Sequence, residues 1–558
     1  MKTVKVKRVF WLIVTIHVAL LMYGASVHSP TLNEPAHLVA GLSNWKFGRF
    51  ELYRVNPPLI RMIAALPVMI VGYEEDWSGF YEEPGARPVV EMGEDFVCTN
   101  GERTFWLITY SRWVCIPFSV LGAAVSFKWA SELAGSRAGL LAAVFWCFSP
   151  NILAYSQLIT PDAHAASLCL LSCFVFSKWL TRPTWRLALT SGLILGCVEL
   201  AKTTFIILGP LWFAIWLGYR FARTAPKTAM LRELAMLATQ LFLALYVLNA
   251  GYGFQGSFAP LGKYTFVSEL FSGGVTPTGN RFAMTMLREL PVPLPTEYVK
   301  GIDIQQRDFE TFGQPSYLNG EFRDHGWWYY YLVVLLLKLP IGTLLLLTNS
   351  VYSLLSPRSR HVRHGLAVLC LLPVAIFGVV SSKSGFSHHG RYALPCLPFV
   401  FIVISVVLGR APRNRFHRTC VVAMLVSSCF ICPHYLSFFN AGCGGPRRGS
   451  NYLLHSNIDW GQDLIFFRRW LKKHGRAKAG LGYYGAFDPT QVGINEIEPI
   501  DVGNDWNAIS VNVARGHTRA IGTRRNRQML DDEIYRHFFG RPPDGQVGYS
   551  ILLFRAAE

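Results

Sequence analysis

Long apolar runs alternate with short polar or basic connections along most of the 558-residue chain. About 20 apolar residues are needed to cross a bilayer as a helix, and shorter runs require local thinning or burial against neighbours. The pattern predicts a polytopic, mainly α-helical bundle of about eleven spans. Their approximate ranges are 10–27, 104–130, 139–154, 163–180, 187–200, 204–219, 234–253, 327–350, 366–380, 392–408 and 420–436.

The first apolar run follows Lys2, Lys5, Lys7 and Arg8. This layout is shared by a cleaved signal peptide and an uncleaved anchor. The run is long for a signal peptide and many spans follow it, so we expect an anchor with a cytoplasmic N-terminus.

Lysine and arginine collect in alternate connections. Besides the N-terminal cluster, one set contains Arg137, Arg182 with Arg186, and the ranges 220–232, 358–363 and 410–418. The positive-inside rule puts this set in the cytoplasm and the chain in a cell inner (plasma) membrane. The outer loops 30–103 and 254–326 and everything after residue 437 then face the extracytoplasmic side.

Two regions differ from the spans. In 33–48 and 57–71, the interleaving of apolar and polar residues predicts amphipathic helices lying along the membrane interface. Beyond residue 437 the hydropathy falls, which predicts a membrane domain over 1–436 and a small extracytoplasmic α/β domain over 437–558. Its expected elements are a helix over 460–474, with Asn457 or Asp459 near its cap, and strands over 480–484, 508–513 and 549–554.

Composition supports the membrane interpretation. Hydrophobic residues make up 51% of the chain and charged residues 16%, against roughly 25% charged in soluble proteins. Twelve cysteines are too dilute for a disulfide framework. The net charge of +18 would suggest nucleic-acid binding in a soluble protein. Here the positions of the basic residues explain the charge, and we expect no nucleic-acid partner.

Two acids lie at predicted outer helix ends. Glu34, just after the first span, can reach both a lipid headgroup and a water-borne acceptor, and Asp162 precedes another span. Acids are also favoured in the first turn of a helix, so capping is the alternative for both. We expect Glu34 and Asp162 to be the catalytic carboxylates.

Cations and histidines are placed on the same predicted face. Lys202 and Arg391 are suited to a phosphate ligand, as a point charge and a planar fork. The alternatives are a pair between Lys202 and Glu199, and an interfacial anchor for Arg391. The other candidate substrate-binding residues are His37, Asn56, His388, His389 and Tyr392. A divalent metal held by His37, His164, His388 or His389 with the two acids is possible, although no closely spaced metal motif is present.

Several short motifs resemble one known superfamily. They are Asn33-Glu34-Pro35-Ala36-His37, Asn56-Pro57-Pro58-Leu59, Gly326-Trp327-Trp328-Tyr329-Tyr330, His389-Gly390-Arg391-Tyr392 and Ser456-Asn457-Ile458-Asp459-Trp460-Gly461-Gln462-Asp463. In their order and placement the chain resembles the protein O-mannosyltransferase and aminoarabinose-transferase superfamily, the GT-C-fold glycosyltransferases of the family-39 type, and in particular a bacterial branch.

The resemblance implies a membrane glycosyltransferase that takes a sugar from a polyprenyl-phosphate donor to a lipid, glycan or protein acceptor on the outer face. It implies Glu34 as the base of an inverting transfer. Two positions depart from the family pattern. Many relatives have two successive acids where this chain has Asn33-Glu34, and the aminoarabinose-type enzymes have a lysine where this chain has Asn56.

The alternative from another class is a polytopic transporter or lipid flippase. Such a protein would show paired, interrupted helices in two similar halves, with polar groups near the middle of the membrane. The ionisable residues here lie at predicted outer helix ends, which favours the transferase.

Overall fold

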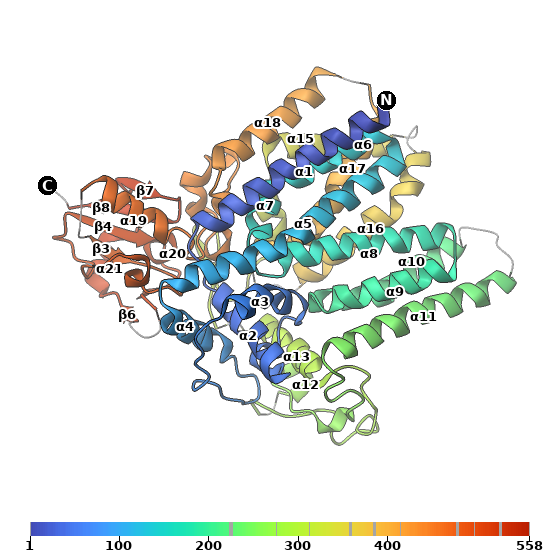
Figure 1. The fold of residues 1–558 in the computed structure, drawn as a ribbon, viewed down its shortest axis with the longest axis horizontal. Coiled ribbons are helices and arrows are strands. Elements are labelled where there is room, and N and C mark those ends of the chain that lie inside the picture. Colours follow the sequence, from blue (N-terminus) through green and yellow to red (C-terminus); the bar gives the residue numbers. More distant parts are fainter. Residues whose placement is uncertain are drawn as a thin grey trace.

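The computed structural model describes residues 2–221, 227–274, 276–311, 313–356, 360–382, 387–412, 414–475, 479–495, 497–523 and 527–556. A long helical bundle forms most of the molecule, and a small domain that contains the C-terminus lies at one end of it (Figure 1). The N-terminus lies at the far end of the bundle.

Every predicted apolar run contains a helix. The helices are α1 Lys2–Val27, α5 Arg103–Ala134, α6 Ser136–Phe148, α7 Pro150–Ser156, α8 Asp162–Thr181, α9 Trp185–Glu199, α10 Leu208–Phe221, α11 Lys227–Gly251, α14 Tyr330–Lys338, α15 Ile341–Leu355, α16 Arg360–Ser382, α17 Leu397–Arg410 and α18 Arg415–Ile431. Within the described ranges, six helices are long and apolar enough to cross a membrane, or up to eight if each of two bent pairs is one span. The described residues therefore contain fewer full-length spans than the eleven expected. Helices such as α9 and α18, with 15 and 17 residues, are short.

The centre of the bundle is α5, which packs against α1, α6, α8 and α17. Large side chains such as Trp146 on α6 and Trp179 on α8 are fully buried around it. Gly122 makes the close approach of α5 and α6 possible, because a Cβ there would lie 2.1 Å from the Trp146 ring. The bundle core is thus a tightly packed set of aromatic and small residues.

One pair of helices is sharply bent. The axes of α14 and α15 differ by 118° at Pro340, which cannot donate the backbone hydrogen bond needed to continue α14. The side-chain amide of Asn440 donates to the carbonyls of Leu336 and Leu339, at 2.5 and 2.9 Å. Asn151 donates to the carbonyl of Lys338 at 2.7 Å. These two asparagines satisfy backbone groups that the break leaves without helical partners.

The first outer loop forms three helices, α2 Glu34–Phe47, α3 Leu59–Val71 and α4 Val89–Asn100. The sequence predicts the first two. However, α2 does not lie on the surface: residues 34–44 are buried, because α2 packs between α3 and α4. Both helices keep an exposed apolar end, with Trp45 and Phe47 on α2 and Met69, Ile70 and Val71 on α3. The expectation of an interfacial helix is therefore corrected for residues 34–44 of α2.

The second long loop lies beside the first. It contains α12 Glu269–Ser272, α13 Thr296–Glu310 and a hairpin of β1 Ser316–Leu318 with β2 Glu321–Arg323. Gly301 on α13 packs against the backbone of the first loop, since a Cβ there would lie 2.2 Å from the carbonyl oxygen of Arg54. The helix α13 is thereby held close to α2 at the same end of the bundle (Figure 1).

The C-terminal domain is built on a four-stranded sheet of order β3-β4-β8-β7. The strands are β3 Gly480–Gly482, β4 Trp506–Ser510, β7 Gly545–Val547 and β8 Ile551–Arg555, with β3 parallel to β4 and the other pairs antiparallel. The remaining elements are α19 Leu464–Lys473, α20 Val511–Ala514, α21 Asp532–Phe538 and the pair β5 Ala520–Ile521 with β6 Gln528–Met529.

Strands are confirmed within 480–484 and 549–554, whereas the predicted strand 508–513 is a strand only up to Ser510 and then continues as α20. The predicted helix begins later than expected. It starts at Leu464 after Asp463, and neither Asn457 nor Asp459 caps it. The carboxylate of Asp459 is instead occupied by the backbone N–H of Gly461, at 3.0 Å, and by the Ser510 hydroxyl.

Helix directions place the predicted outer residues at one end of the bundle. Helix α8 begins at Asp162, and Lys202 follows the end of α9. Arg182 follows the other end of α8, and Arg186 lies near the start of α9. Both are therefore at the helix ends opposite to those that carry Asp162 and Lys202. If the positive-inside rule holds, Arg415 is cytoplasmic and Gly545 is extracytoplasmic.

We expect a single cysteine near Gly545, but not one near Arg415, to react with a membrane-impermeant thiol reagent in intact cells. The background variant lacks the native cysteines, and labelling after lysis controls for accessibility. The reverse pattern would overturn the orientation.

Candidate active site

A cavity of about 480 Å³ opens at the end of the bundle, between the first loop, α13 and the start of the C-terminal region. This size is typical of ligand pockets. Seven of the nine predicted site residues line it: His37, Asn56, Asp162, Lys202, His389, Arg391 and Tyr392. The cavity thus brings together residues from five separate parts of the sequence.

A charged cluster forms one wall of the cavity. Lys202 Nζ lies 2.6 Å from Asp162 Oδ1, and Arg391 Nε lies 3.4 Å from Asp162 Oδ2. All three side chains are buried. Two cations facing one carboxylate leave the cluster with one excess positive charge. The alternative pairing of Lys202 with Glu199 is not what the structure contains.

Local backbone structure sets the positions of these three groups. Pro161 precedes Asp162, which occupies the first turn of α8. Lys202 lies in extended backbone between α9 and the short 3-10 helix Thr203–Ile207, and Arg391 lies in the 3-10 helix Gly390–Cys396. Each charged group therefore stands at a helix end, where a side chain can face a polar cavity without crossing the apolar core.

Arg391 is held by further contacts. Its Nη1 donates to the Ser456 hydroxyl at 2.7 Å, and its guanidinium lies 4.4 Å from the centre of the Trp460 ring. Stacking on an aromatic face orients the planar guanidinium. The contact to Asp162 is the longest of Arg391's polar contacts, so this is the one most easily exchanged for a ligand.

His37 and Asn56 form the wall contributed by the first loop. The His37 ring makes an edge contact with Tyr53 at 4.8 Å, and the Asn56 amide donates to the Tyr53 hydroxyl at 2.8 Å. Burial, and secondarily the charge of Arg61, lowers the pKa of His37 to about 3. His37 is therefore a neutral group that offers hydrogen bonds rather than charge.

Glu34 has a different environment from the one predicted. It is fully buried, and it is not among the residues that line this cavity. Its Oε1 accepts from Arg112 Nε at 2.8 Å and from the Ile159 N–H at 3.2 Å. Its Oε2 accepts from Arg112 Nη2 at 2.5 Å and from the backbone and hydroxyl of Thr31 at 2.8 and 3.0 Å.

With five donors on its two oxygens, Glu34 has no lone pair directed at an acceptor in the cavity. These contacts tie Glu34 to the surrounding scaffold, and its assignment as the base stays a prediction. The neighbouring residue Asn33 lines the cavity instead, at the position where many relatives of the resembled superfamily have an acid.

His388 and His389 belong to a group of four imidazoles with His455 and His517. Ring centroids are 4.7 Å apart for His389 and His455, and 5.0 Å apart for His455 and His517. Burial lowers the pKa of all four, to about 3 for His388 and about 4 for His517. Only His389 and His455 line the cavity, and His388 lies behind them.

The cavity is also lined by residues that the sequence did not single out. Arg87 of the first loop pairs with Asp308 of α13 at 2.5 Å, and both line the cavity. His455 and Trp460 also line it. Trp460 lies within the 456–463 motif and His455 directly precedes it, so this motif could have pointed to both residues. Arg87 lies in irregular backbone and Asp308 lies in α13, and neither belongs to a sequence motif.

The metal ligands suggested by the sequence do not form one set. His164 lies away from the cavity, where its Nε2 contacts the Leu158 carbonyl at 2.8 Å and its ring packs near Phe118. Within the described ranges, one group of three potential ligands is close enough to share an ion, and it contains none of the suggested residues.

One known family model matches part of the chain. The model of the family described as dolichyl-phosphate-mannose-protein mannosyltransferase matches residues 107–243, from α5 into α11. This match confirms the resemblance to the protein O-mannosyltransferase superfamily. It covers the segment that carries Asp162 and Lys202. No curated protein matches the chain at a significant level.

Solved structures with a similar arrangement are distant in sequence. ArnT from Cupriavidus metallidurans bound to undecaprenyl phosphate is 13% identical with a TM-score of 0.48, covering 87% of this chain and 73% of that one. Apo ArnT from the same organism is 14% identical with a TM-score of 0.46, covering 76% and 64%. The apo oligosaccharyltransferase of Archaeoglobus fulgidus is 13% identical with a TM-score of 0.37, covering 83% and 58%.

We expect Glu34→Gln to destabilise the protein, because it leaves the buried charge of Arg112 without its counter-ion. Breaking such a pair from one side costs about 3 to 5 kcal/mol. The measurement is the melting temperature of the purified protein in detergent, with exposed Glu102→Gln as the matched control. A Glu34→Gln protein that melts like wild type but has lost all activity would support Glu34 as the base.

Proposed function

We propose that this protein transfers a sugar from a polyprenyl-phosphate donor to a lipid, glycan or protein acceptor at the extracytoplasmic face of the membrane. The observation that carries the proposal is the cavity at the end of the bundle in which Asp162 is held between Lys202 and Arg391.

The charge balance of the cluster suits a lipid phosphate. A sugar-linked phosphodiester carries one negative charge, which matches the one excess positive charge of the cluster. Arg391 can turn its planar fork from Asp162 to two phosphate oxygens, while Lys202 stays with the carboxylate. Cations directed at the leaving phosphate stabilise the charge that develops as the sugar departs.

We propose that Asp162 is the general base that accepts the proton of the acceptor hydroxyl. Once the phosphate has engaged Arg391, the Asp162 oxygen that faced Arg391 becomes available to an acceptor hydroxyl. The carboxylate takes the hydroxyl proton as the oxygen attacks the anomeric carbon opposite the phosphate, which inverts the configuration. A well-placed general base contributes on the order of 10² to 10⁴ in rate.

We propose that different residues of the cavity wall contact the donor and the acceptor. His37, Asn56 and Tyr392 lie near the charged cluster and are proposed to contact the sugar and phosphate of the donor. Residues of α13 also line the cavity, and we propose that they contact the acceptor.

A transporter would need polar groups that continue across the membrane. The charged residues of this cavity lie at helix ends on one end of the bundle, which supports the transferase over a transporter or flippase.

We expect Asp162→Asn to lower turnover at least about 100-fold, because an amide cannot accept the proton. Binding of polyprenyl phosphate should stay as tight as in wild type or become tighter, since the competing anion is removed. Release of polyprenyl phosphate from a panel of polyprenyl-phosphate-linked sugars is followed by mass spectrometry.

Exposed Asp324→Asn is the matched control for this change and should behave like wild type. Wild-type turnover in Asp162→Asn would rule out Asp162 as the base. No release of polyprenyl phosphate by the wild-type protein from any donor in the panel would count against the proposed reaction.

We expect Arg391→Lys to weaken binding of polyprenyl phosphate and to reduce turnover by about tenfold or more, because lysine keeps the charge but loses the planar fork. Expression and melting temperature should stay near wild type. Full activity in Arg391→Lys, together with poor expression of Arg391→Ala, would identify Arg391 as an anchor and move the phosphate role to Lys202.

A further inference from the structure

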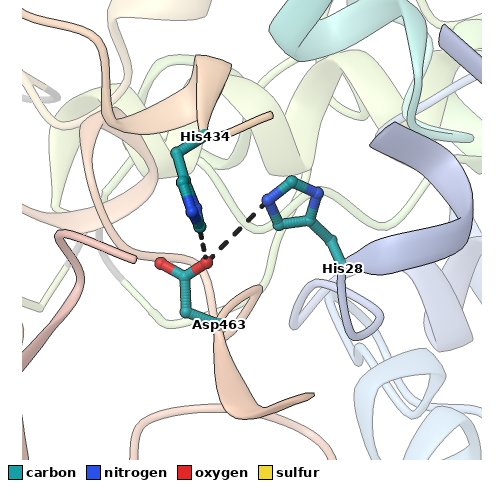
Figure 2. A group of neighbouring side chains, drawn as sticks. All are labelled: His28, His434 and Asp463. Carbon is teal, nitrogen blue, oxygen red and sulfur yellow. Dashed lines mark hydrogen bonds and ion pairs between the residues drawn. The ribbon is translucent and has the colours of Figure 1, made fainter. Parts of the chain in front are cut away.

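Outside the cavity, two histidines and an aspartate from separate parts of the chain converge (Figure 2). His28 follows the end of α1, His434 lies after α18, and Asp463 precedes α19. One ligand atom from each lies within 4.8 Å of the others. Asp463 and His28 are buried, while the side chain of His434 is 16% exposed.

The orientation of His28 indicates that a cation fits between these groups. Its Nδ1 lies 3.0 Å from the Gly24 carbonyl, so Nδ1 carries the hydrogen and Nε2 carries a lone pair. That lone pair faces Asp463 Oδ1 at 3.8 Å. In the neutral imidazole this places two electron pairs opposite each other in a buried place, and a cation between them stabilises the arrangement.

Asp463 is held so that one oxygen is directed at the histidines. Its Oδ2 accepts from the Ser550 hydroxyl at 2.7 Å and from the Gln462 amide at 3.4 Å. Its Oδ1 lies 3.1 Å from His434 Nδ1. Gly548 makes room for the carboxylate, because a Cβ there would lie 2.1 Å from Asp463 Cγ, and its φ of +60° favours glycine.

Such supporting contacts are those of a metal site. Ligating histidines usually donate their second ring N–H to a carbonyl, and ligating carboxylates are themselves hydrogen-bonded. Zinc–ligand bonds of 2.0–2.1 Å in a tetrahedron place neighbouring ligand atoms roughly 3.3 Å apart. The two contacts of Asp463 Oδ1, at 3.1 and 3.8 Å, bracket this separation.

We propose that His28, His434 and Asp463 bind a divalent transition-metal ion, with zinc the best match to two imidazoles and one carboxylate. Water reaches a fourth position from the exposed side of His434. Arg112 donates to the His28 carbonyl at 3.0 Å, but its charge is balanced by Glu34. The charge of Asp463 is therefore available to the ion.

The ion joins the end of α1 to the C-terminal region. Next to it, the Ser29 N–H donates to the Gln462 carbonyl at 3.1 Å, and the Leu32 N–H donates to the Trp460 carbonyl at 2.9 Å. Trp460 is a cavity wall residue that stacks on Arg391. The site is a structural clamp behind that wall, and its existence does not depend on the proposed reaction.

The test measures the metal content of full-length protein produced with zinc and purified without chelator. We expect about one zinc per chain in wild type and in exposed His325→Gln, and less than about a tenth in His28→Gln and His434→Gln. Cobalt added to metal-depleted wild type should give visible absorption bands that both ligand variants lack. Ser550→Ala, which keeps all three ligands, should weaken zinc binding about 10- to 100-fold.

Chelator should lower the melting temperature of wild type and leave that of His434→Gln unchanged. Wild-type protein without zinc and without a cobalt spectrum would overturn the proposal, whatever the variants do. It also fails if His28→Gln and His434→Gln bind as much zinc as wild type, or if chelator lowers the melting temperature of His434→Gln equally, because the ion would then be bound elsewhere.

Discussion

The buried pair of Glu34 and Arg112 is the contact on which the end of the bundle depends. Arg112, on α5, uses its guanidinium on both carboxylate oxygens and on the carbonyls of Ala25, His28 and Ser29. Two charges removed from water are tolerated only when their hydrogen bonds are complete, and here they are. The pair fixes where the chain leaves α1 and where α2 begins, so that His37 and Asn33 face the cavity.

This arrangement separates two acids that look equivalent in the sequence. Glu34 is surrounded by donors that belong to the scaffold, whereas Asp162 is surrounded by cations that a phosphate can compete for. The donors to Glu34 are two nitrogens of Arg112, the Thr31 hydroxyl and two backbone N–H groups, and they can be exchanged only by rearranging the packed scaffold. The scaffold acid thereby holds the reactive region in place while its own contacts stay fixed.

Much of the bundle was predictable, because the length of an apolar run sets where a helix can form. The cavity wall formed by Asp162, Lys202 and Arg391 was predictable for a related reason, since charged groups between apolar runs must lie at helix ends. The direction of a side chain was not predictable. Whether Glu34 or Asn33 faces the cavity depends on contacts with Arg112, 78 residues away, and the burial of α2 depends on α4. The convergence of His28, His434 and Asp463 likewise follows from tertiary packing alone.

The break between α14 and α15 has a consequence for how the protein is made. Asn440, which satisfies the carbonyls of Leu336 and Leu339, is 104 residues from the first of them in the chain. During synthesis these two helices are therefore made before that partner exists. The hydrogen bonds from Asn440 that complete the bent pair can form only after the segment beyond α18 has docked.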